Sequence, residues 1–344
     1  MKYFNLNSLV RSNIQKLEAY SSARNEFKGK AEVYLDANES PFGVLNRYPD
    51  PKQIKVKERL AIVKKLKINQ IFIGNGSDEA IDIALRIFCE PGKDKALSFY
   101  PTYSMYKVSA AINNVELVEI ALTSDFQIDV KALKNIIANN NIKLIFICSP
   151  NNPTGNCFDP TSVLYILNNF KGIVFIDEAY IDFSTSKSYI AKINEHPNLI
   201  VSQTFSKAWG LAGARIGTAF ANSDIIKMFN KVKAPYNIST LNQEAVLSKL
   251  DKLHEFEKEK DYLISEKIKM SLNLKKVKAV KKIHPSQANF ILVEISNAQQ
   301  VYNYLISKKI VVRKSPVKNC LRLGIGKKTE NKKLLKALQQ INAK

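Results

Sequence analysis

The sequence predicts an α/β protein in which a large domain, with a mostly parallel sheet flanked by helices, is followed by a smaller α/β domain. Short apolar runs alternate with helical patterns over about 170 residues in the middle of the chain, which is typical of parallel sheets covered by helices. After Pro235 the pattern changes to a long charged helical stretch and a second, shorter series of strands and helices. With 344 residues the chain is long enough for two domains with buried cores.

The apolar runs of the middle region are the expected strands of the large sheet, and the segments between them are the expected helices. Asp159 followed by Pro160 is typical of a helix start, because Asp caps the first turn and proline fits its first position. A further short strand is expected at residues 30–36. The other strands are predicted at residues 71–74, 96–99, 117–121, 143–148, 173–176, 199–203 and 216–220, and the helices near 78–90, 102–112, 129–139, 160–170 and 223–233.

The remaining segments complete the predicted domain organisation. Residues 1–30 are polar and helix-prone and are expected to form an N-terminal arm, residues 31–238 the large domain, and residues 239–344 the small domain. The small domain is expected to contain a helical stretch at about 239–272, strands at 289–295, 310–313 and 321–325, and helices near 298–308 and 329–342.

The composition excludes several classes of protein. Hydrophobic residues make up 45% and charged residues 24% of the chain, as in ordinary globular proteins. No apolar run reaches the roughly 18 residues of a transmembrane helix, and the start of the chain does not resemble a signal peptide, so no membrane association and a cytoplasmic location are expected. The four cysteines lack metal-ligand spacing, which predicts free thiols and no metal site: Cys89, Cys148, Cys157 and Cys320.

The net charge of +21 has two interpretations. One is a nucleic-acid-binding protein, and the other is a lysine-rich solvated surface with some steering of anionic substrates. The second is favoured, because no basic block interleaves with aromatic residues and the lysines are spread along the chain. Many of them are expected on polar helix faces, such as Lys52, Lys55, Lys57, Lys64, Lys65 and Lys67.

The segment around Lys207 carries the most chemistry. Thr204 and Ser206 precede the lysine, and Arg215 follows it eight positions later among several glycines. A partly desolvated lysine can form a Schiff base with a carbonyl cofactor, and hydroxyl and guanidinium groups can bind a phosphate on the same cofactor. The alternative is a surface lysine in a loop of small residues.

Two further motifs follow buried strands. Asn152 lies in a loop shaped by proline and glycine, and its amide can point into a site or simply belong to a turn. Asp177 ends the next strand, and a buried carboxylate needs a cation or metal partner. A magnesium site of the nucleotide-hydrolase type would require a phosphate loop, which the chain lacks. Tyr180 lies three residues beyond Asp177 and can point its hydroxyl at the same ligand.

Two more segments suggest contacts with a flat phosphorylated ligand. Ser77 and Asp78 open a helix after a strand, and backbone N–H groups at such a Ser-capped start can bind phosphate. Tyr103 follows the next strand and can stack on a flat ring, although core packing is an equally common role for such a tyrosine.

Together these motifs resemble the fold-type I pyridoxal-phosphate enzymes, and within them the aminotransferases, over nearly the whole chain. Their order and the spacings between Asn152, Asp177 and Lys207 match that family. The resemblance implies that Lys207 holds pyridoxal 5'-phosphate as a Schiff base and shuttles a proton. It implies that Asp177 pairs with the pyridine nitrogen, that Asn152 and Tyr180 bind the phenolic oxygen, and that Tyr103 stacks on the ring. The implied phosphate ligands are Ser77, Asp78, Thr204, Ser206 and Arg215.

Several segments resemble the histidinol-phosphate aminotransferase branch of this family more closely, namely residues 17–24, 35–43, 46–50, 88–94, 312–314 and 320–326. One departure is Glu18-Ala19, where the branch usually carries proline. The resemblance implies that Arg322 binds the carboxylate of glutamate or 2-oxoglutarate and that Arg313 faces the phosphate end of the donor. It implies that Tyr20 and Asn38 line the substrate site, and that Tyr48 reaches the cofactor phosphate of the other subunit of a homodimer.

The expected reaction is the transfer of the amino group of L-histidinol phosphate to 2-oxoglutarate, giving imidazole acetol phosphate and glutamate, in L-histidine biosynthesis. One site must then accept a phosphate and carboxylates, which guanidinium groups can do. Two alternatives on the same scaffold are a phosphothreonine decarboxylase and an aromatic amino acid aminotransferase. For Arg313 and Arg322, surface salt bridges are the other interpretation.

Overall fold

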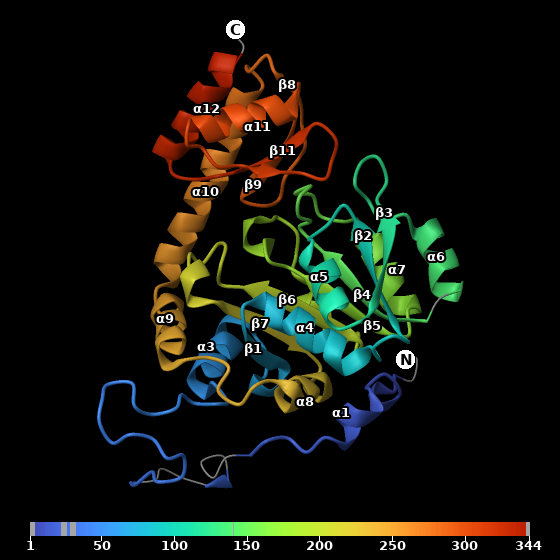
Figure 1. The fold of residues 1–344 in the computed structure, drawn as a ribbon, viewed down its shortest axis with the longest axis vertical. Coiled ribbons are helices and arrows are strands. Elements are labelled where there is room, and N and C mark those ends of the chain that lie inside the picture. The colour runs from blue at the N-terminus through green and yellow to red at the C-terminus, as the bar shows by residue number, and fades with distance from the viewer. Residues whose placement is uncertain (1–3, 22–25, 28–31, 140, 342–344) are drawn as a thin grey trace.

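The computed structural model describes residues 4–21, 26–27, 32–139 and 141–341. A seven-stranded sheet forms the centre of the large domain, in the order β1-β7-β6-β5-β4-β2-β3. A four-stranded sheet, in the order β10-β11-β9-β8, lies beyond it in the C-terminal part (Figure 1). The strands of the larger sheet are β1 (Ile71–Asn75), β2 (Lys95–Tyr100), β3 (Glu116–Ala121), β4 (Ile142–Cys148), β5 (Ile173–Asp177), β6 (Leu199–Thr204) and β7 (Ile216–Ala221).

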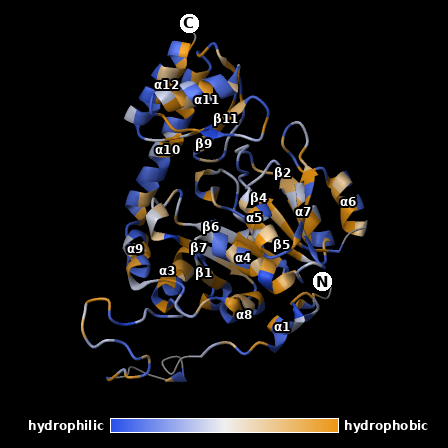
Figure 2. Cartoon of the chain, in the orientation of Figure 1, coloured by the Kyte–Doolittle hydropathy of each residue, from blue (hydrophilic) through white to orange (hydrophobic). Residues whose placement is uncertain are grey.

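The larger sheet is parallel except at one strand. β2, β3, β4, β5 and β6 pair in parallel, whereas β7 runs antiparallel to both β6 and β1. Every residue of β5 and β6 is buried, as expected for strands covered by helices on both faces. Figure 2 shows hydrophobic residues along β4 and β5. The predicted fold class is therefore confirmed.

Alternate side chains of the strands enter two separate cores. Ile145 and Ile147 of β4 belong to one core, and Leu144 and Phe146 belong to the other, because successive side chains of a strand point to opposite faces. The helices of the large domain are α3 (Ile54–Lys64), α4 (Ser77–Phe88), α5 (Met105–Ile112), α6 (Val130–Asn139), α7 (Pro160–Asn169) and α8 (Ser223–Val232). As predicted, Asp159 caps α7 by accepting the N–H of Thr161 at 2.9 Å.

The small sheet packs against helices around a third core. Its strands are β8 (Val280–Ile283), β9 (Phe290–Ile295), β10 (Arg313–Lys314) and β11 (Cys320–Gly324). The helices of this part are α9 (Thr240–Leu250), α10 (Leu253–Leu274), α11 (Ala298–Ser307) and α12 (Lys328–Ile341). Figure 2 shows mostly hydrophilic residues along α10.

The predicted single helical stretch at 239–272 is wrong, because the chain breaks between α9 and α10 at Asp251 and Lys252. Leu250 and Phe256 are both buried. With 3.6 residues per turn, six positions do not bring a helix back to the same face. The break therefore allows both side chains to reach the core.

Two other predictions about elements are wrong, and one strand was not predicted. Residues 32–36 contain no strand, since Val33 and Leu35 are exposed and pair with no sheet, while residues 30 and 31 lie outside the described residues. The strand predicted at 310–313 covers only Arg313–Lys314. β8 was not predicted, because Val280–Ile283 has two lysines between apolar ends rather than an alternating pattern.

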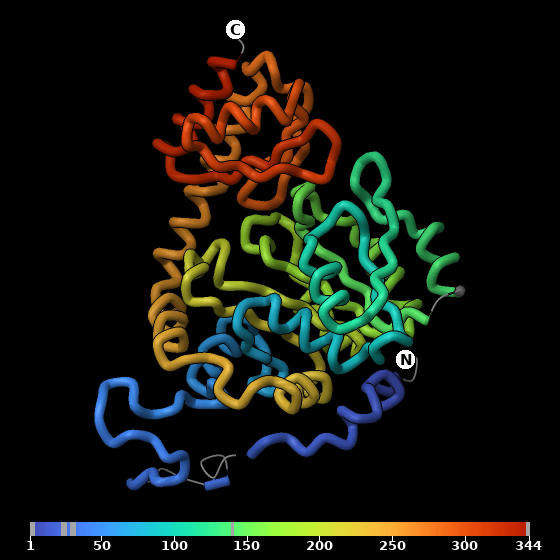
Figure 3. Tube along the Cα trace, viewed as in Figure 1, coloured from blue at the N-terminus to red at the C-terminus, as the bar shows by residue number. Residues whose placement is uncertain are grey.

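The described residues before α3 form two parts, of which the first packs into a core of the large domain through Val10 and Ile14. Short helices occur at η1 (Leu6–Ser8) and α1 (Ser12–Lys16), and the rest of the predicted arm falls partly outside the described residues, at 1–3, 22–25 and 28–30. The described trace from residue 32 up to α3 forms a wide excursion from the body (Figure 3). Its apolar side chains Leu35, Phe42 and Val44 are more than four-fifths exposed, at 88%, 83% and 98%.

No helix within the described ranges has the length and apolar content to cross a bilayer. Among those residues no group of three His, Cys, Asp or Glu side chains is arranged to bind a metal ion. The four cysteines are free thiols.

Candidate active site

A cavity of about 590 Å³ lies beyond the carboxyl ends of the parallel strands and also receives residues of the small sheet. Ligands in open α/β sheets bind at this edge. Twelve of the predicted site residues line the cavity, namely Ser77, Asp78, Tyr103, Asn152, Asp177, Tyr180, Thr204, Ser206, Lys207, Arg215, Arg313 and Arg322. Tyr20, Asn38 and Tyr48 are not among its lining residues.

Asp177 ends β5 and is buried, with 2% of its surface exposed. Its carboxylate accepts hydrogen bonds from the hydroxyls of Tyr106 and Ser202, at 2.9 and 3.2 Å, and from the N–H of Ala179 at 3.2 Å. Burial raises the pKa of Asp177 to about 6, although these hydrogen bonds oppose the increase. Asp177 is therefore a carboxylate that a cation in the cavity would stabilise.

Lys207 lies in the connection between β6 and β7, and its side chain is exposed to the cavity. Its Nζ is 5.6 Å from the ring centroid of Tyr180. Partial burial, together with the positive charge of Arg322, lowers the pKa of Lys207 below that of a free lysine, whereas Asp177 opposes this change. A lysine in this setting has an increased fraction of unprotonated amine near neutral pH.

The N-terminus of α4 supplies uncapped N–H groups. The N-cap is Gly76, one residue earlier than predicted, and among the described residues no side chain caps the first turn. Gly217 of β7 lies against this turn, where a Cβ atom would come within 2.1 Å of the Ser77 nitrogen. The first turn of α4 is consequently open to an anion.

Arg215 faces this helix start. It adopts a left-handed conformation with φ 52°, and its Nη2 atom lies 3.6 Å from an oxygen of Asp78. On the other side, Thr204 accepts the N–H of Ser206 at 3.1 Å. Backbone N–H groups, hydroxyls and a guanidinium group thus surround one end of the cavity, which is the donor set of a phosphate site.

Tyr103 lies on the same side of the cavity. Its hydroxyl donates to Asp78 at 3.1 Å, and its ring meets the ring of Tyr106 edge-on at 5.7 Å. Tyr106 in turn stacks on Phe146, with ring centroids 4.8 Å apart. The aromatic side chain predicted to contact a ligand is therefore supported from behind by a stack of buried rings.

Arg322 of β11 connects the two sheets. Its Nη1 donates a hydrogen bond to the Asn152 side chain, and its guanidinium carbon lies 5.1 Å from the ring centroid of Phe290. The Phe290 ring also meets the ring of Tyr180 edge-on at 5.1 Å. Within the described residues neither Arg313 nor Arg322 forms an ion pair, so the interpretation as surface salt bridges is wrong for the side chains as they lie here.

Three predicted site residues lie elsewhere in the single chain. Tyr48 stacks on Tyr236 with ring centroids 4.4 Å apart, and with Asn38 it lines a separate cavity of about 350 Å³. Tyr20 is 66% exposed and lines a third cavity. All three belong to the N-terminal region that precedes α3, so their predicted roles would require contact with another chain or a different position of this region.

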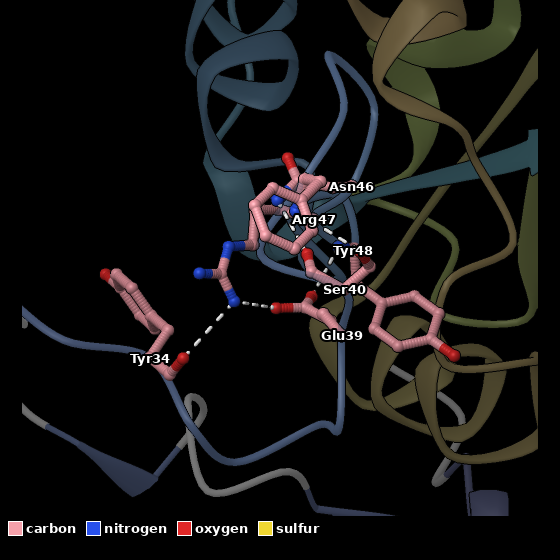
Figure 4. Close-up of polar contacts among 7 residues, drawn as sticks. Tyr34, Glu39, Ser40, Asn46, Arg47 and Tyr48 are labelled. Atoms are coloured by element: carbon pink, nitrogen blue, oxygen red, sulfur yellow. Dashed lines mark hydrogen bonds and ion pairs between the residues drawn. The ribbon is translucent and has the colours of Figure 1, made fainter.

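Tyr48 is held in place by a polar network within that region. The Glu39 carboxylate accepts the N–H of Tyr48 at 2.6 Å and forms an ion pair with Arg47 at 2.7 Å (Figure 4). The same guanidinium group donates to the Tyr34 carbonyl at 3.2 Å. This segment is exposed but has defined internal contacts.

Sequence reasoning missed Tyr106 and Ser202, the two side chains that hydrogen-bond to Asp177. The available signal is the spacing of Tyr103 and Tyr106 in the helix predicted near 102–112, since residues three apart on a helix face the same side, although α5 begins only at Met105. Ser202 is two residues before Thr204 in a strand that pairs with β5, and the pairing opposes it to Asp177. Lys314 also lines the cavity, next to Arg313.

Comparison with known proteins identifies the family. The family model for aminotransferases of class I and II matches residues 20–338. A histidinol-phosphate aminotransferase from Flavobacterium psychrophilum is 49% identical over 350 residues, covering 99% of this chain and 100% of the relative.

Solved structures support the fold. The histidinol-phosphate aminotransferase from Sinorhizobium meliloti in complex with pyridoxal-5'-phosphate superposes with a TM-score of 0.80 at 24% identity, covering 89% of each chain. L-threonine-O-3-phosphate decarboxylase from Porphyromonas gingivalis superposes with a TM-score of 0.74 at 22% identity, covering 87% of this chain and 92% of that one. At such identities the likeness concerns the fold alone. From the family model and the close relative, the chain belongs to the class I and II aminotransferases, in the histidinol-phosphate aminotransferase family.

Proposed function

We propose that this chain transfers the amino group of L-histidinol phosphate to 2-oxoglutarate, with pyridoxal 5'-phosphate as cofactor, and so acts in L-histidine biosynthesis. The products are imidazole acetol phosphate and glutamate. The observation that carries the proposal is that one cavity contains Lys207, Asp177 and two arginines from the small sheet, Arg313 and Arg322. Relatives close to half identical over the full chain carry the name of this enzyme.

The residues of the cavity fit the cofactor. The uncapped first turn of α4 and Arg215 offer donors for its phosphate, and buried Asp177 offers a partner for a protonated ring nitrogen. Lys207 offers an amine that can hold the group covalently. When bound, pyridoxal phosphate supplies a carbonyl that exchanges with amines and a ring that withdraws electrons from the substrate carbon.

Lys207 is proposed to move the proton in each half-reaction. Its lowered pKa gives the amine a larger unprotonated fraction, so that it can accept a proton from the substrate Cα and return it to the former carbonyl carbon of the cofactor, on the other side of the amino nitrogen. Asp177 stays ionised when it faces a positive nitrogen, since such a pair lowers a carboxyl pKa, and it thereby keeps the proton on that nitrogen.

Arg322 and Arg313 are proposed to bind the anionic ends of the substrates. 2-Oxoglutarate and glutamate carry carboxylates that Arg322 can bind from its position against Asn152. Histidinol phosphate lacks an α-carboxylate but carries a phosphate, which Arg313 can bind because it lines the same cavity. Thus two guanidinium groups serve two substrates in one site.

The proposal includes a homodimer. Leu35, Phe42 and Val44 leave a large apolar surface exposed on the excursion that precedes α3, and such surfaces mark contacts with other chains. If a second copy packs on this segment, Tyr48 of the first copy would lie near the cavity of the second. A cytoplasmic location is also part of the proposal, and the four free thiols support it.

The test is the visible absorption spectrum of the purified protein. A yellow band that bleaches with histidinol phosphate alone, and returns with 2-oxoglutarate, is expected. A band that histidinol phosphate leaves unchanged would contradict the substrate assignment. Phosphothreonine and phenylalanine then distinguish the alternatives, because a decarboxylase releases carbon dioxide without consuming 2-oxoglutarate, whereas an aromatic aminotransferase bleaches with phenylalanine.

A further inference from the structure

Trp209 lies two residues after Lys207 but is buried in a core of the large domain and does not line the cavity. Ala208, between them, is buried in the same core, whereas Lys207 is exposed to the cavity. The role proposed for Lys207 uses its amine alone and leaves this buried aromatic residue unexplained. One short segment thus contributes a side chain to the cavity and the next two to the core.

The backbone around Lys207 and Trp209 forms a closed turn. The N–H of Gly210 donates to the Lys207 carbonyl at 3.3 Å, and the N–H of Leu211 donates to the Phe205 carbonyl at 2.9 Å. Gly210 has φ 70°, a left-handed conformation that glycine adopts readily and that allows the chain to reverse here. Two hydrogen bonds across so few residues leave little freedom between the indole ring and the lysine, so a displacement of Trp209 also displaces Lys207.

The indole ring of Trp209 packs on α10. It stacks on the ring of Phe256, with ring centroids 3.8 Å apart and an angle of 11° between the planes. Phe256 lies in the first turn of α10 and is buried. The ring of Phe205 also lies near the indole, at 5.2 Å and tilted by 52°. Because stacked aromatic pairs are favoured beyond the burial of their area, the position of the indole ring follows that of α10.

The Trp209 side chain also donates a hydrogen bond to Asp182. Burial raises the pKa of Asp182, and this hydrogen bond opposes the increase. Asp182 belongs to the short helix η3 (Ile181–Phe183), which directly follows the cavity residue Tyr180. Trp209 therefore joins the lysine turn to two other elements, α10 and the segment that continues from Tyr180.

α10 continues from Phe256 into the core of the small domain (Figure 1). Met270 and Leu274 belong to that core, and Leu263, which precedes them, packs against the cores of both domains. The helix has 22 residues without a break, which corresponds to a length of about 33 Å. It therefore connects the small sheet to the ring of Trp209.

We infer that Trp209 is a positioning residue: its stack on Phe256 fixes Lys207 relative to the small sheet. The Lys207 amine has to move a proton between two atoms in each half-reaction, and its reach depends on the turn that Trp209 holds. A misplacement of about 1 Å can lower the rate of such a step a hundredfold. This inference rests on the role proposed for Lys207.

The test follows a single turnover of the cofactor-loaded protein with glutamate, either ordinary or deuterated at Cα. Trp209→Leu should lower the rate per bound cofactor about ten- to a hundredfold, and the glutamate concentration for half-maximal rate should change less than about threefold. The isotope effect should increase, because proton transfer then contributes more to the measured rate. A residue that only stabilises the fold would alter neither the rate per bound cofactor nor the isotope effect.

Two further variants examine the stack itself. Phe256→Leu removes the other ring and should slow the reaction to a similar extent. Combined with Trp209→Leu it should add little, since both changes remove one contact. Trp209→Phe retains a ring that can stack on Phe256 and should keep most of the rate.

Phe229→Leu is the matched control. Phe229 of α8 is buried and meets Phe72 of β1 edge-on at 5.2 Å, and neither residue lines the cavity. This variant should lower the melting temperature by an amount comparable to Trp209→Leu but change the rate less than about twofold. A second readout needs no turnover. The pH midpoint of the cofactor's visible absorption band should shift in Trp209→Leu and Phe256→Leu, because the charges around Lys207 are displaced, and should stay unchanged in Phe229→Leu.

The inference is overturned if Trp209→Leu keeps the rate per bound cofactor, if Phe229→Leu is equally slow, or if Trp209→Phe is as slow as Trp209→Leu. It is also overturned if the whole loss of activity comes from lost cofactor. A band that glutamate leaves unchanged in the unmodified protein would contradict the proposed function instead, so the two failures are distinguishable.

Discussion

Arg313 and Arg322 are directly opposite each other in the antiparallel pair of β10 and β11, and both line the active-site cavity. Like charges directly opposite on neighbouring strands are destabilising. An anion between or beside the two guanidinium groups would therefore stabilise this pair of strands. Because both residues belong to the small sheet, anion binding also connects that sheet to the large domain.

The two arginines should differ in which substrate they serve. Arg322→Gln should lower kcat/KM for 2-oxoglutarate by about ten- to a hundredfold, the effect of losing one charged hydrogen bond. Arg313→Gln should lower kcat/KM for histidinol phosphate more than Arg322→Gln does. Single-turnover measurements of each half-reaction provide the comparison. If both variants impair both substrates equally, the division of roles between the two arginines is wrong.

Lys207→Ala should abolish turnover while leaving the fold intact, because the side chain is exposed to the cavity and fills no core. Surface changes of this kind usually alter stability by less than about 0.5 kcal/mol. Activity and the melting temperature are measured together. Lys171→Ala, at another exposed lysine, is the matched control and should leave both unchanged. Near-normal turnover of Lys207→Ala would refute the covalent role.

Asp177→Asn should reduce kcat by about a hundredfold or more, because an amide cannot hold a proton on the ring nitrogen. The same change should stabilise the cofactor-free protein at pH 8. The folded-state pKa of Asp177 is raised to about 6 by burial. Because the folded-state pKa is raised, the ionised carboxylate destabilises the folded protein above about pH 6. This destabilisation disappears as the pH falls towards the pKa of an ordinary carboxyl group.

The size of the pKa shift of Asp177 corresponds to a loss of roughly 2–3 kcal/mol in the free energy of unfolding at pH 8. The measurement is thermal unfolding of both cofactor-free proteins between pH 4 and pH 8. The stability advantage of Asp177→Asn should be present at pH 8 and absent near pH 4. An advantage that does not depend on pH would show that Asp177 is not the titrating group.

Tyr48 should act on the cavity of the other subunit. Tyr48→Phe and Lys207→Ala proteins, each impaired alone, are mixed under conditions that exchange subunits. Some mixed dimers then contain one site with both Lys207 and Tyr48 intact, so activity should reappear on mixing. No recovery, with exchange verified by differently tagged chains, would mean that Tyr48 does not act across a dimer.

The sequence predicted the parts of the site that depend on local order. Asn152, Asp177 and Lys207 follow consecutive parallel strands, and the carboxyl ends of such strands meet at one edge. Their proximity therefore follows once the strands are recognised. Arg215 was predicted from its place eight residues after Lys207, and the structure adds that the strand after it runs antiparallel to β6.

Other features depend on contacts that no local pattern shows. Lys57 is buried beside Val56 on α3 because that helix packs against distant segments, α9 and β1. The Tyr106 bond to Asp177 joins residues 71 positions apart. A strand at 32–36 would have needed a pairing partner, and the described residues of this chain provide none.

The reversed direction of β7 also determines where the chain can be cut. Residues 205–215 connect β6 and β7 at one edge of the sheet, so both ends of this connection lie at the cavity. The connection contains both Lys207 and Arg215. The connection from α7 to β5, by contrast, enters its strand at the opposite edge, and Lys171 within it is exposed. A circularly permuted chain with new termini at Lys171 should keep the site, whereas termini within 205–215 should destroy it.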